Sequence, residues 1–195
     1  MKKKVIVTGC AGFIGSNLVD LLLKKNFSVI GIDNLSTGHL RNLDDAKKNK
    51  NFHFVKFDLL DIKKIKNLFK NIDMVFHLAA NADVRYGIDN PKKDLEQNTI
   101  VTFNILESMR LNGVKKIVFS STGSIYGETS IIPTPENAEF PIQTSFYGAS
   151  KLACEGLIQA YCDHYNFKSW IFRFVSILGE RYSHGHVYDF YKKLL

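Results

Sequence analysis

The feature that most constrains this chain is a set of three glycines directly after its first apolar run. Residues 5–7 form that run, and Gly9, Gly12 and Gly15 follow it in the order GxxGxxG. A helical pattern of apolar residues begins at Phe13. Gly9 would make the tight turn, Gly12 would let the backbone approach a pyrophosphate, and Gly15 would let the helix pack against a sheet. The sequence therefore predicts a phosphate-binding turn at the N-terminus of a helix.

An aspartate at the end of the second predicted strand refines this expectation. Asp33 lies eighteen residues after Gly15. A carboxylate at this place can accept hydrogen bonds from a ribose diol and would repel a 2′-phosphate. The residue favours NAD over NADP as the ligand of the turn, and the alternative is an ordinary aspartate at a strand end.

Short β-rich apolar runs alternate with longer amphipathic segments along the chain. The predicted strands are residues 5–7, 28–32, 51–57, 74–78, 116–121 and 170–174. The predicted helices are residues 13–25, 62–69, 98–110, 145–164 and 187–195. The expected apolar face of the first helix consists of Phe13, Asn17, Leu18, Leu21 and Leu22. This alternation predicts an α/β fold, a doubly wound parallel sheet covered by helices on both faces. We expect the strand order 3-2-1-4-5-6, with the ligand at the switch point between strands 1 and 4.

The composition excludes several classes of protein. Hydrophobic residues make up 45% of the 195 residues and charged residues 23%, which is typical of a globular chain and not of a disordered one. The sequence contains no apolar run of about eighteen residues, so no membrane span is expected, and the apolar run after the first lysines is too short for a signal peptide. The formal charge is +7, but the lysines are scattered in pairs. This pattern indicates a solvated surface that suits an anionic small molecule and not a nucleic acid. Three cysteines without metal-ligand spacing indicate a reduced, cytoplasmic setting.

A second chemical signal lies on the longest predicted helix. Tyr147 and Lys151 are four residues apart, so they share one helix face. A lysine ammonium beside a phenol favours the phenolate, which suits general acid–base chemistry. The preceding predicted strand runs into Ser120, Ser121 and Thr122, which would place hydroxyl groups near the phenol.

The motifs of this chain resemble those of the extended short-chain dehydrogenase/reductase family, and within it the nucleotide-sugar epimerases and dehydratases of the UDP-glucose 4-epimerase type. They are TGCAGFIGSNLVD, DNLSTG, HLAA, SSTGSIYG, YGASK and the segment 173–179, and they follow the family's order over the whole chain. The resemblance implies an NAD-binding Rossmann domain over residues 1–175 and a homodimer. We expect residues 176–195 to begin a substrate-binding lobe that is mostly absent from an apparently truncated chain.

The resemblance also implies roles for individual residues. The catalytic residues would be Thr122, Tyr147 and Lys151. The residues that bind or support the NAD site would be Gly9, Gly12, Phe13, Ile14, Gly15, Asp33, Asn34, Ser36, Thr37, Gly38, Asp58, Leu59, Leu78, Ala79, Ala80, Asn98, Ser120, Tyr147, Lys151 and Phe174. The substrate-binding residues would be Val84, Ser121, Thr122, Ser124, Tyr147 and Ser176.

A contrast within the family bears on the reaction. Members that eliminate water carry Thr-Asp-Glu where this chain has Thr122, Gly123 and Ser124, so both carboxyl groups are missing. The remaining residues suffice to oxidise and re-reduce a carbinol. We therefore expect epimerisation of a nucleotide-activated sugar at C4 through a transient 4-keto intermediate. A 4,6-dehydratase, a reductase and a non-catalytic NAD-binding protein are the alternatives. Ser176 stands where relatives usually have an asparagine that helps to hold the substrate diphosphate.

Two histidines near the C-terminus and two long helices bear on a possible metal site and on dimerisation. His184 and His186 have no carboxylate or cysteine nearby, so we expect loop or substrate-lobe contacts and no metal site. Relatives dimerise through two long helices from each subunit, which correspond to residues 98–110 and 145–164. The candidate interface residues are Met109, Leu157, Ile158 and Tyr161, and a buried core role would suit them equally well.

Overall fold

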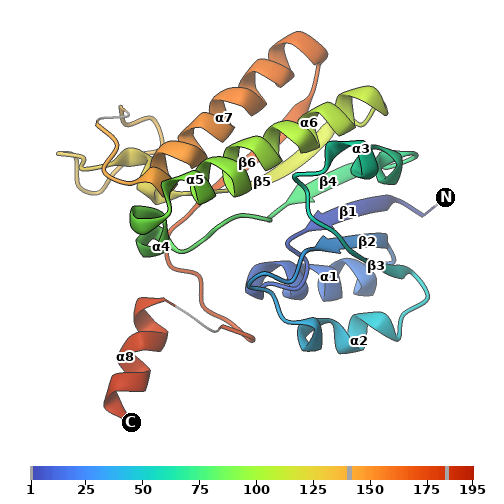
Figure 1. Cartoon of the computed structure of the whole chain (residues 1–195), viewed down its shortest axis with the longest axis horizontal. Coiled ribbons are helices and arrows are strands. Elements are labelled where there is room, and N and C mark those ends of the chain that lie inside the picture. Colours follow the sequence, from blue (N-terminus) through green and yellow to red (C-terminus); the bar gives the residue numbers. More distant parts are fainter. Residues whose placement is uncertain (1, 140–141, 183–184) are drawn as a thin grey trace.

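The sheet is the organising element of the fold. The computed structural model describes residues 2–139, 142–182 and 185–195. In these residues, six parallel strands form one sheet in the order β3-β2-β1-β4-β5-β6, as predicted (Figure 1). The strands are β1 (Lys4–Thr8), β2 (Ser28–Asp33), β3 (Phe52–Lys56), β4 (Met74–His77), β5 (Lys116–Thr122) and β6 (Lys168–Phe174). The order reverses between β1 and β4, so the connections that leave these two strands diverge and open a crevice.

Helices cover both faces of this sheet. The helices are α1 (Phe13–Lys24), η1 (Leu40–Leu43), α2 (Asp44–Lys47), α3 (Ile62–Ile65), η2 (Lys66–Phe69), α4 (Val84–Asp89), α5 (Pro91–Asp94), η3 (Leu95–Ile100), α6 (Val101–Leu111), η4 (Gly123–Tyr126), α7 (Phe146–Tyr165) and α8 (His186–Leu194). Helices α6 and α7 lie on one face and α1 and α2 on the other (Figure 1). The doubly wound α/β class is thereby confirmed.

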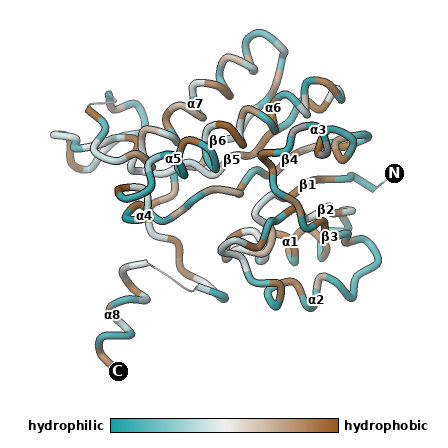
Figure 2. The backbone as a smooth tube through the Cα atoms, viewed as in Figure 1, coloured by the Kyte–Doolittle hydropathy of each residue, from teal (hydrophilic) through white to brown (hydrophobic). Residues whose placement is uncertain are grey.

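The alternation of side chains along β1 shows how the two faces are filled. Ile6 is fully buried in the cluster that also contains Ile105 of α6. Val5 and Val7 point the opposite way, into the cluster that contains Val19 of α1. Successive side chains of a strand point to opposite faces, so a strand covered on both sides must be apolar throughout. Figure 2 shows this as hydrophobic colour along the central strands.

The predicted apolar face of the first helix is correct for Leu22, which is buried, and for Leu18, which packs against the core, but it is wrong for Leu21. The buried residues of α1 are Gly15, Ser16, Val19, Leu22 and Leu23. Leu21, which was expected to face the core, is 52% exposed. The reason is that Gly15 must face inward against the glycine turn, and positions four and seven residues further along a helix share its side. The contact at Gly15 therefore sets the rotation of the whole helix.

The helix predicted over residues 98–110 begins earlier than expected. Helical backbone runs from Pro91 through α5, η3 and α6 to Leu111. Pro91 occupies the first helical turn, where its missing N–H costs nothing. The middle part, η3, is a π-helix that contains Asn98. Such π-turns are rare and occur often at functional sites. The predicted helix over 62–69 likewise divides into the short α3 and the 3₁₀ turn η2.

Three of the four residues that were candidates for a dimer interface lie in the core of the chain. Their interpretation as interface residues is therefore wrong, and the alternative of a buried core role is correct. Met109 and Ile158 are fully buried in the core cluster beneath α6 and α7, and Tyr161 is 8% exposed. Leu157 packs partly buried against the same cluster. Side chains enclosed within one chain cannot contact a second copy.

The last strand and last helix present apolar side chains to solvent. On β6, at the edge of the sheet, Trp170 and Phe172 are nearly half exposed. Helix α8 stands apart from the sheet (Figure 1) and exposes Phe190, Tyr191 and Leu194. Across the described residues, every helix falls short of the length and apolar character that a membrane crossing requires.

Candidate active site

The glycine turn brings the backbones of β1, β4 and α1 into close contact. Gly9 has a left-handed backbone with φ of +67°, and a Cβ there would lie 2.8 Å from the Ala79 nitrogen. A Cβ on Gly15 would lie 2.0 Å from the Gly9 carbonyl oxygen. Gly12 precedes α1 and provides no side-chain cap, which leaves the first N–H groups of the helix available to an anion. The turn therefore has the geometry of a phosphate cradle.

A cavity of about 200 Å³ lies beside this turn and contains most of the predicted NAD contacts. Its lining includes Gly9, Gly12, Phe13, Ile14, Gly15, Asp33, Asn34, Ser36, Thr37, Gly38, Leu59, Leu78, Ala79, Ala80 and Ser120. Phe57, Ala82 and Gln97 also line it and were missed, although each lies within two residues of a predicted contact. The fit of this cradle to a dinucleotide rests on the close backbone approach and the uncapped helix N-terminus.

Two predicted NAD contacts support the cavity from behind and do not line it. Asp58 accepts hydrogen bonds from the Asn34 side chain at 3.3 Å and from the Leu60 N–H at 3.0 Å. Asn98 is buried, accepts from the Asn81 N–H at 2.8 Å and donates to the Ser150 hydroxyl at 2.8 Å. Asn98 thereby ties the segment after β4 to helix α7, as expected for a residue that supports the active-site backbone.

Asp33 also holds the backbone on both sides of the cavity. Its Oδ2 atom accepts the N–H of Ala11 at 2.9 Å, and its Oδ1 atom accepts the N–H of Leu35 at 2.8 Å. The carboxylate therefore orders both the glycine turn and the loop that follows β2. The ribose interpretation and the strand-end interpretation are compatible, because each carboxylate oxygen has a further lone pair.

A buried chain of hydrogen bonds joins β1 to β4 and α6. The Thr8 hydroxyl lies 2.7 Å from His77 Nδ1 and accepts the N–H groups of Leu78 and Ala79. His77 Nε2 lies 3.0 Å from the Thr102 hydroxyl, which itself donates to the Asn98 carbonyl. Burial lowers the pKa of His77 to about 3, so the imidazole is neutral. With both hydroxyls so engaged, Nε2 carries the proton and Nδ1 accepts from Thr8.

The three predicted catalytic residues lie along one wall of a second cavity of about 260 Å³. This cavity shares Phe13, Leu78 and Ser120 with the first, so the two form one continuous cleft. Helix α7 begins at the cap Ser145, whose hydroxyl accepts the Gly148 N–H at 2.9 Å. Tyr147 therefore lies in the first turn of the helix, and Lys151 follows one turn later. Phe174 and Ser176 line the same cavity.

Burial controls the ionisation of these groups. Lys151 is 2% exposed, donates to the Ser120 carbonyl at 2.8 Å and lies over the Phe119 ring. Burial lowers the pKa of Lys151 to about 8, although the nearby Asp94 and Glu155 oppose the change. Burial also raises the pKa of Tyr147, and a hydrogen bond with Thr122 opposes that change. The lysine is thus mainly cationic at neutral pH.

Of the remaining predicted substrate contacts, Ser121 also lines the second cavity, whereas Ser124 and Val84 do not. The Ser121 hydroxyl donates to the buried Glu155. Ser124 stands in η4, where its N–H donates to the Thr122 hydroxyl at 3.1 Å. Val84 begins α4 and lines a third cavity with Arg85. His184 and the side chain of His186 lie outside the described residues. Within the described part of the chain, no group of three or more His, Cys, Asp or Glu side chains could hold a metal ion.

Comparison with known proteins gives the class to which this fold and site belong. Residues 5–195 match the NAD dependent epimerase/dehydratase family. The chain is a member of this family, and its cofactor is NAD.

Individual relatives give the same class. The UDP-glucose 4-epimerase of Mycolicibacterium smegmatis is 40% identical over 167 residues, which are 84% of this chain and 52% of that protein. A crystal structure of a UDP-galactose 4-epimerase superposes with a TM-score of 0.88 at 37% identity, covering 98% of this chain and 62% of that one. The UDP-glucose 4-epimerase of Thermus thermophilus, solved as a complex with NAD, gives a TM-score of 0.79 at 38% identity, covering 87% and 54%. The chain therefore spans between half and two thirds of the length of these relatives.

Two glycines on helices provide a matched test of the cradle. We expect Gly15→Ala to weaken NAD binding by at least ~10-fold and to lower the free energy of unfolding by about 1–3 kcal/mol, because its Cβ would overlap the Gly9 carbonyl. Gly156→Ala is the control, since nothing lies within 4 Å of its Cβ. This variant should retain NAD affinity and gain about 0.5–1 kcal/mol. Calorimetry measures the NAD affinity and urea denaturation measures the free energy of unfolding. Equal NAD affinity in the two variants would contradict the assignment of the glycine turn as the phosphate-binding site.

The buried lysine predicts how stability depends on pH. The pKa of Lys151 is about 8 in the folded chain, against 10.5 for an ordinary lysine. Between these values the unfolded state binds more protons, so the contribution of Lys151 to the free energy of unfolding rises with pH. We expect the difference between the native protein and Lys151→Met to rise by about 2–3 kcal/mol from pH 8 to pH 10.5. Denaturation in urea at several pH values measures it, and a flat difference would show that the amine is not buried as a cation.

Proposed function

We propose that this chain carries the catalytic machinery of an NAD-dependent nucleotide-sugar 4-epimerase. The observation that supports the proposal is a single cleft in which Thr122, Tyr147 and Lys151 adjoin the dinucleotide cradle. The names of the relatives support the same reaction class. Residues 1–175 would form the NAD-binding domain, and residues 176–195 would begin the substrate-binding lobe.

The cleft suggests which residues would hold the cofactor. The diphosphate would lie at the N-terminus of α1, against Gly12 and Gly15, where uncapped N–H groups and the helix dipole favour negative charge. The adenosine ribose would lie beside Asp33, whose charge disfavours a 2′-phosphate and so selects NAD over NADP. Lys151 would hold the ribose next to the nicotinamide. When bound, NAD supplies reversible oxidation of a sugar carbinol.

The side chains of the cleft would then move one proton from the sugar to Tyr147 and back again. The Tyr147 phenolate oxygen takes the proton of the sugar 4-hydroxyl and returns it after the 4-keto sugar has turned over. Thr122 hydrogen-bonds the same sugar oxygen and keeps it near the phenol. Burial raises the pKa of the Tyr147 phenol, so the phenolate would depend on the Lys151 ammonium and on the positive nicotinamide ring of the cofactor. The Lys151 pKa of about 8 leaves the amine mainly cationic at neutral pH.

The end of β5 favours epimerisation over the alternative reactions. Elimination of water needs an acid and a base near C5 and C6 of the sugar, and Gly123 and Ser124 carry no carboxyl group at the positions where dehydratases have them. A purely NAD-binding protein would not need a buried lysine one helical turn from a partly buried tyrosine. A buried cation in such a place reduces stability, so its presence favours a catalytic role.

Replacing the phenol tests the function. We expect Tyr147→Phe to lower turnover by about two to four orders of magnitude, the range for loss of a general acid–base group, while NAD affinity stays within about two-fold. Tyr165→Phe, on the exposed end of the same helix, is the control and should retain turnover. The assay incubates the protein with UDP-, GDP- and dTDP-sugars and identifies products. Absence of product from every sugar would contradict the proposed function, and full turnover by Tyr147→Phe would contradict the proposed base.

We also propose that the chain forms a homodimer through the outer faces of α6 and α7. Phe103 on α6 is 42% exposed and Ile100, just before it, is 40% exposed. Ala153 is exposed on α7, and its small side chain would let a second helix pair approach. We expect a dimer by light scattering at micromolar concentration and a monomer after Phe103→Glu. A monomeric native protein would contradict the proposal.

A further inference from the structure

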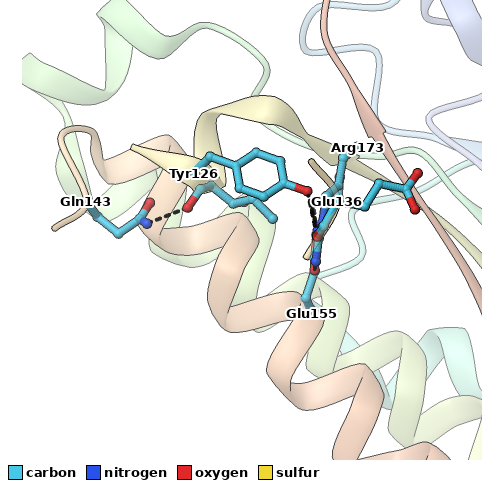
Figure 3. Close-up of polar contacts among 7 residues, drawn as sticks. Tyr126, Glu136, Gln143, Glu155 and Arg173 are labelled. Carbon is cyan, nitrogen blue, oxygen red and sulfur yellow. Dashed lines mark hydrogen bonds and ion pairs between the residues drawn. The ribbon is translucent and has the colours of Figure 1, made fainter. Parts of the chain in front are cut away.

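An ion pair between a buried carboxylate and a partly exposed guanidinium lies beneath the catalytic residues and takes no part in the proton transfer. Glu155 on α7 is 2% exposed and faces Arg173 on β6. Arg173 donates through Nε to Oε1 at 3.2 Å and through Nη2 to Oε2 at 2.9 Å (Figure 3). The guanidinium and the carboxylate therefore meet in a two-point contact, which fixes their orientation as well as their separation.

The carboxylate of this pair contacts both catalytic elements. Glu155 follows Lys151 by one helical turn, so its position is rigidly linked to that of the ammonium. Its Oε1 atom also accepts the hydroxyl of Ser121, which directly precedes Thr122 on β5. One carboxylate thus connects the helix that carries Lys151 to the strand that carries Thr122.

The guanidinium extends this connection to the segment after Thr122. Arg173 Nη1 donates to the Tyr126 hydroxyl and, at 2.7 Å, to the Glu136 carbonyl (Figure 3). The guanidinium also lies 5.0 Å from the centre of the Tyr126 ring. Tyr126 ends η4, and the N-cap of η4 is Thr122 itself, whose hydroxyl accepts the Ser124 N–H. Arg173 therefore fixes the far end of the turn that begins at the catalytic threonine.

Stability alone does not account for such a pair. Removing the Glu155 carboxylate from water is costly, because its side chain is only 2% exposed against 22% for that of Arg173. Replacing such a pair by apolar side chains of similar volume is often neutral or stabilising. An apolar pair would fill the space between α7 and β6 but could not bond Ser121, Tyr126 and the Glu136 carbonyl. Two of the contacts that only the charged pair can make, those to Ser121 and Tyr126, lie on the strand and the turn on either side of Thr122.

We propose that Glu155 and Arg173 are positioning residues that hold the Thr122 hydroxyl and the Lys151 ammonium at a fixed geometry around Tyr147. The proposal rests on the function proposed above, in which those three residues act on the sugar. Positioning of this kind raises turnover without adding contacts to substrate or cofactor, because small displacements of reacting groups are costly.

A double replacement separates positioning from stability. Glu155→Met/Arg173→Met removes both charges of the pair together, so we expect a folded protein whose urea midpoint falls less than that of either single replacement, which leaves one charge of the pair behind. We expect kcat to fall ~10- to 100-fold, with KM for the sugar and Kd for NAD within about two-fold. Glu107→Met/Arg110→Met is the matched control, since that pair also makes a two-point contact and bonds a tyrosine hydroxyl, but on α6. The control should retain kcat.

A conservative variant covers the case in which the double replacement does not fold. Arg173→Lys keeps the charge beside Glu155 but cannot bond the carboxylate, Tyr126 and the Glu136 carbonyl together. We expect a native urea midpoint with kcat reduced ~10-fold. Unchanged kcat in Arg173→Lys, or in a folded double variant, would overturn the proposal.

A spectroscopic readout keeps the test independent of turnover. In the NAD complex, ionisation of Tyr147 is followed by its ultraviolet absorbance as the difference between each protein and its Tyr147→Phe counterpart. Because the Thr122 hydrogen bond lowers the pKa of this phenol, loosening Thr122 should raise it in the Glu155/Arg173 double variant and leave it unchanged in the control. A raised pKa without any epimerase activity in the native protein would support positioning and contradict the proposed function. Epimerase activity in the native protein, with neither the Tyr147 pKa nor kcat changed in the double variant, would support the proposed function and contradict positioning.

Discussion

The structure depends on the close contact between the turn after β1 and the first residues after β4. Gly9 has space only for a hydrogen beside Ala79, and the Thr8 hydroxyl accepts the N–H groups of Leu78 and Ala79. Because the strand order reverses between β1 and β4, the backbone diverges directly above this contact, and the cleft forms there. A side chain on Gly9 would push the two strand ends apart. It would distort the phosphate-binding turn, the base of the cleft and the packing of α1 against the turn.

Burial lowers the pKa of two basic side chains at the edge of the sheet but leaves them in different charge states. His77 is enclosed between two hydroxyls and stays neutral, so it serves as a fixed link between β1 and α6. Lys151 is equally enclosed, yet carbonyl and carboxylate groups face it, and its charge persists at neutral pH. The ordinary pKa values decide the difference: burial lowers that of His77 from 6.5 and that of Lys151 from 10.5, and only the lysine stays charged at neutral pH.

Sequence patterns predicted the strand order, the glycine turn and the Tyr147–Lys151 pair because each is encoded by local spacing. The features that were missed depend on partners far apart along the chain. The inward face of α1 follows from the contact of Gly15 with Gly9, which overrode the apolar pattern that placed Leu21 inside. Arg173 and Tyr126 are 47 residues apart, and no periodicity links them. The π-turn at Asn98 was also missed, and the side-chain hydrogen bonds of Asn98 to Asn81 and Ser150 again join residues far apart along the chain.

The position of β6 at the edge of the sheet makes the fluorescence of its tryptophan sensitive to whatever covers that edge. Trp170 is the single tryptophan of the sequence, and it lies nearly half exposed on the outermost strand. An indole in that setting emits at a wavelength set by the water around it. Any polypeptide that covers the edge, whether a further strand or another molecule, would remove that water and shift the emission to the blue. The intrinsic fluorescence of the chain therefore reads the state of its open sheet edge without any label.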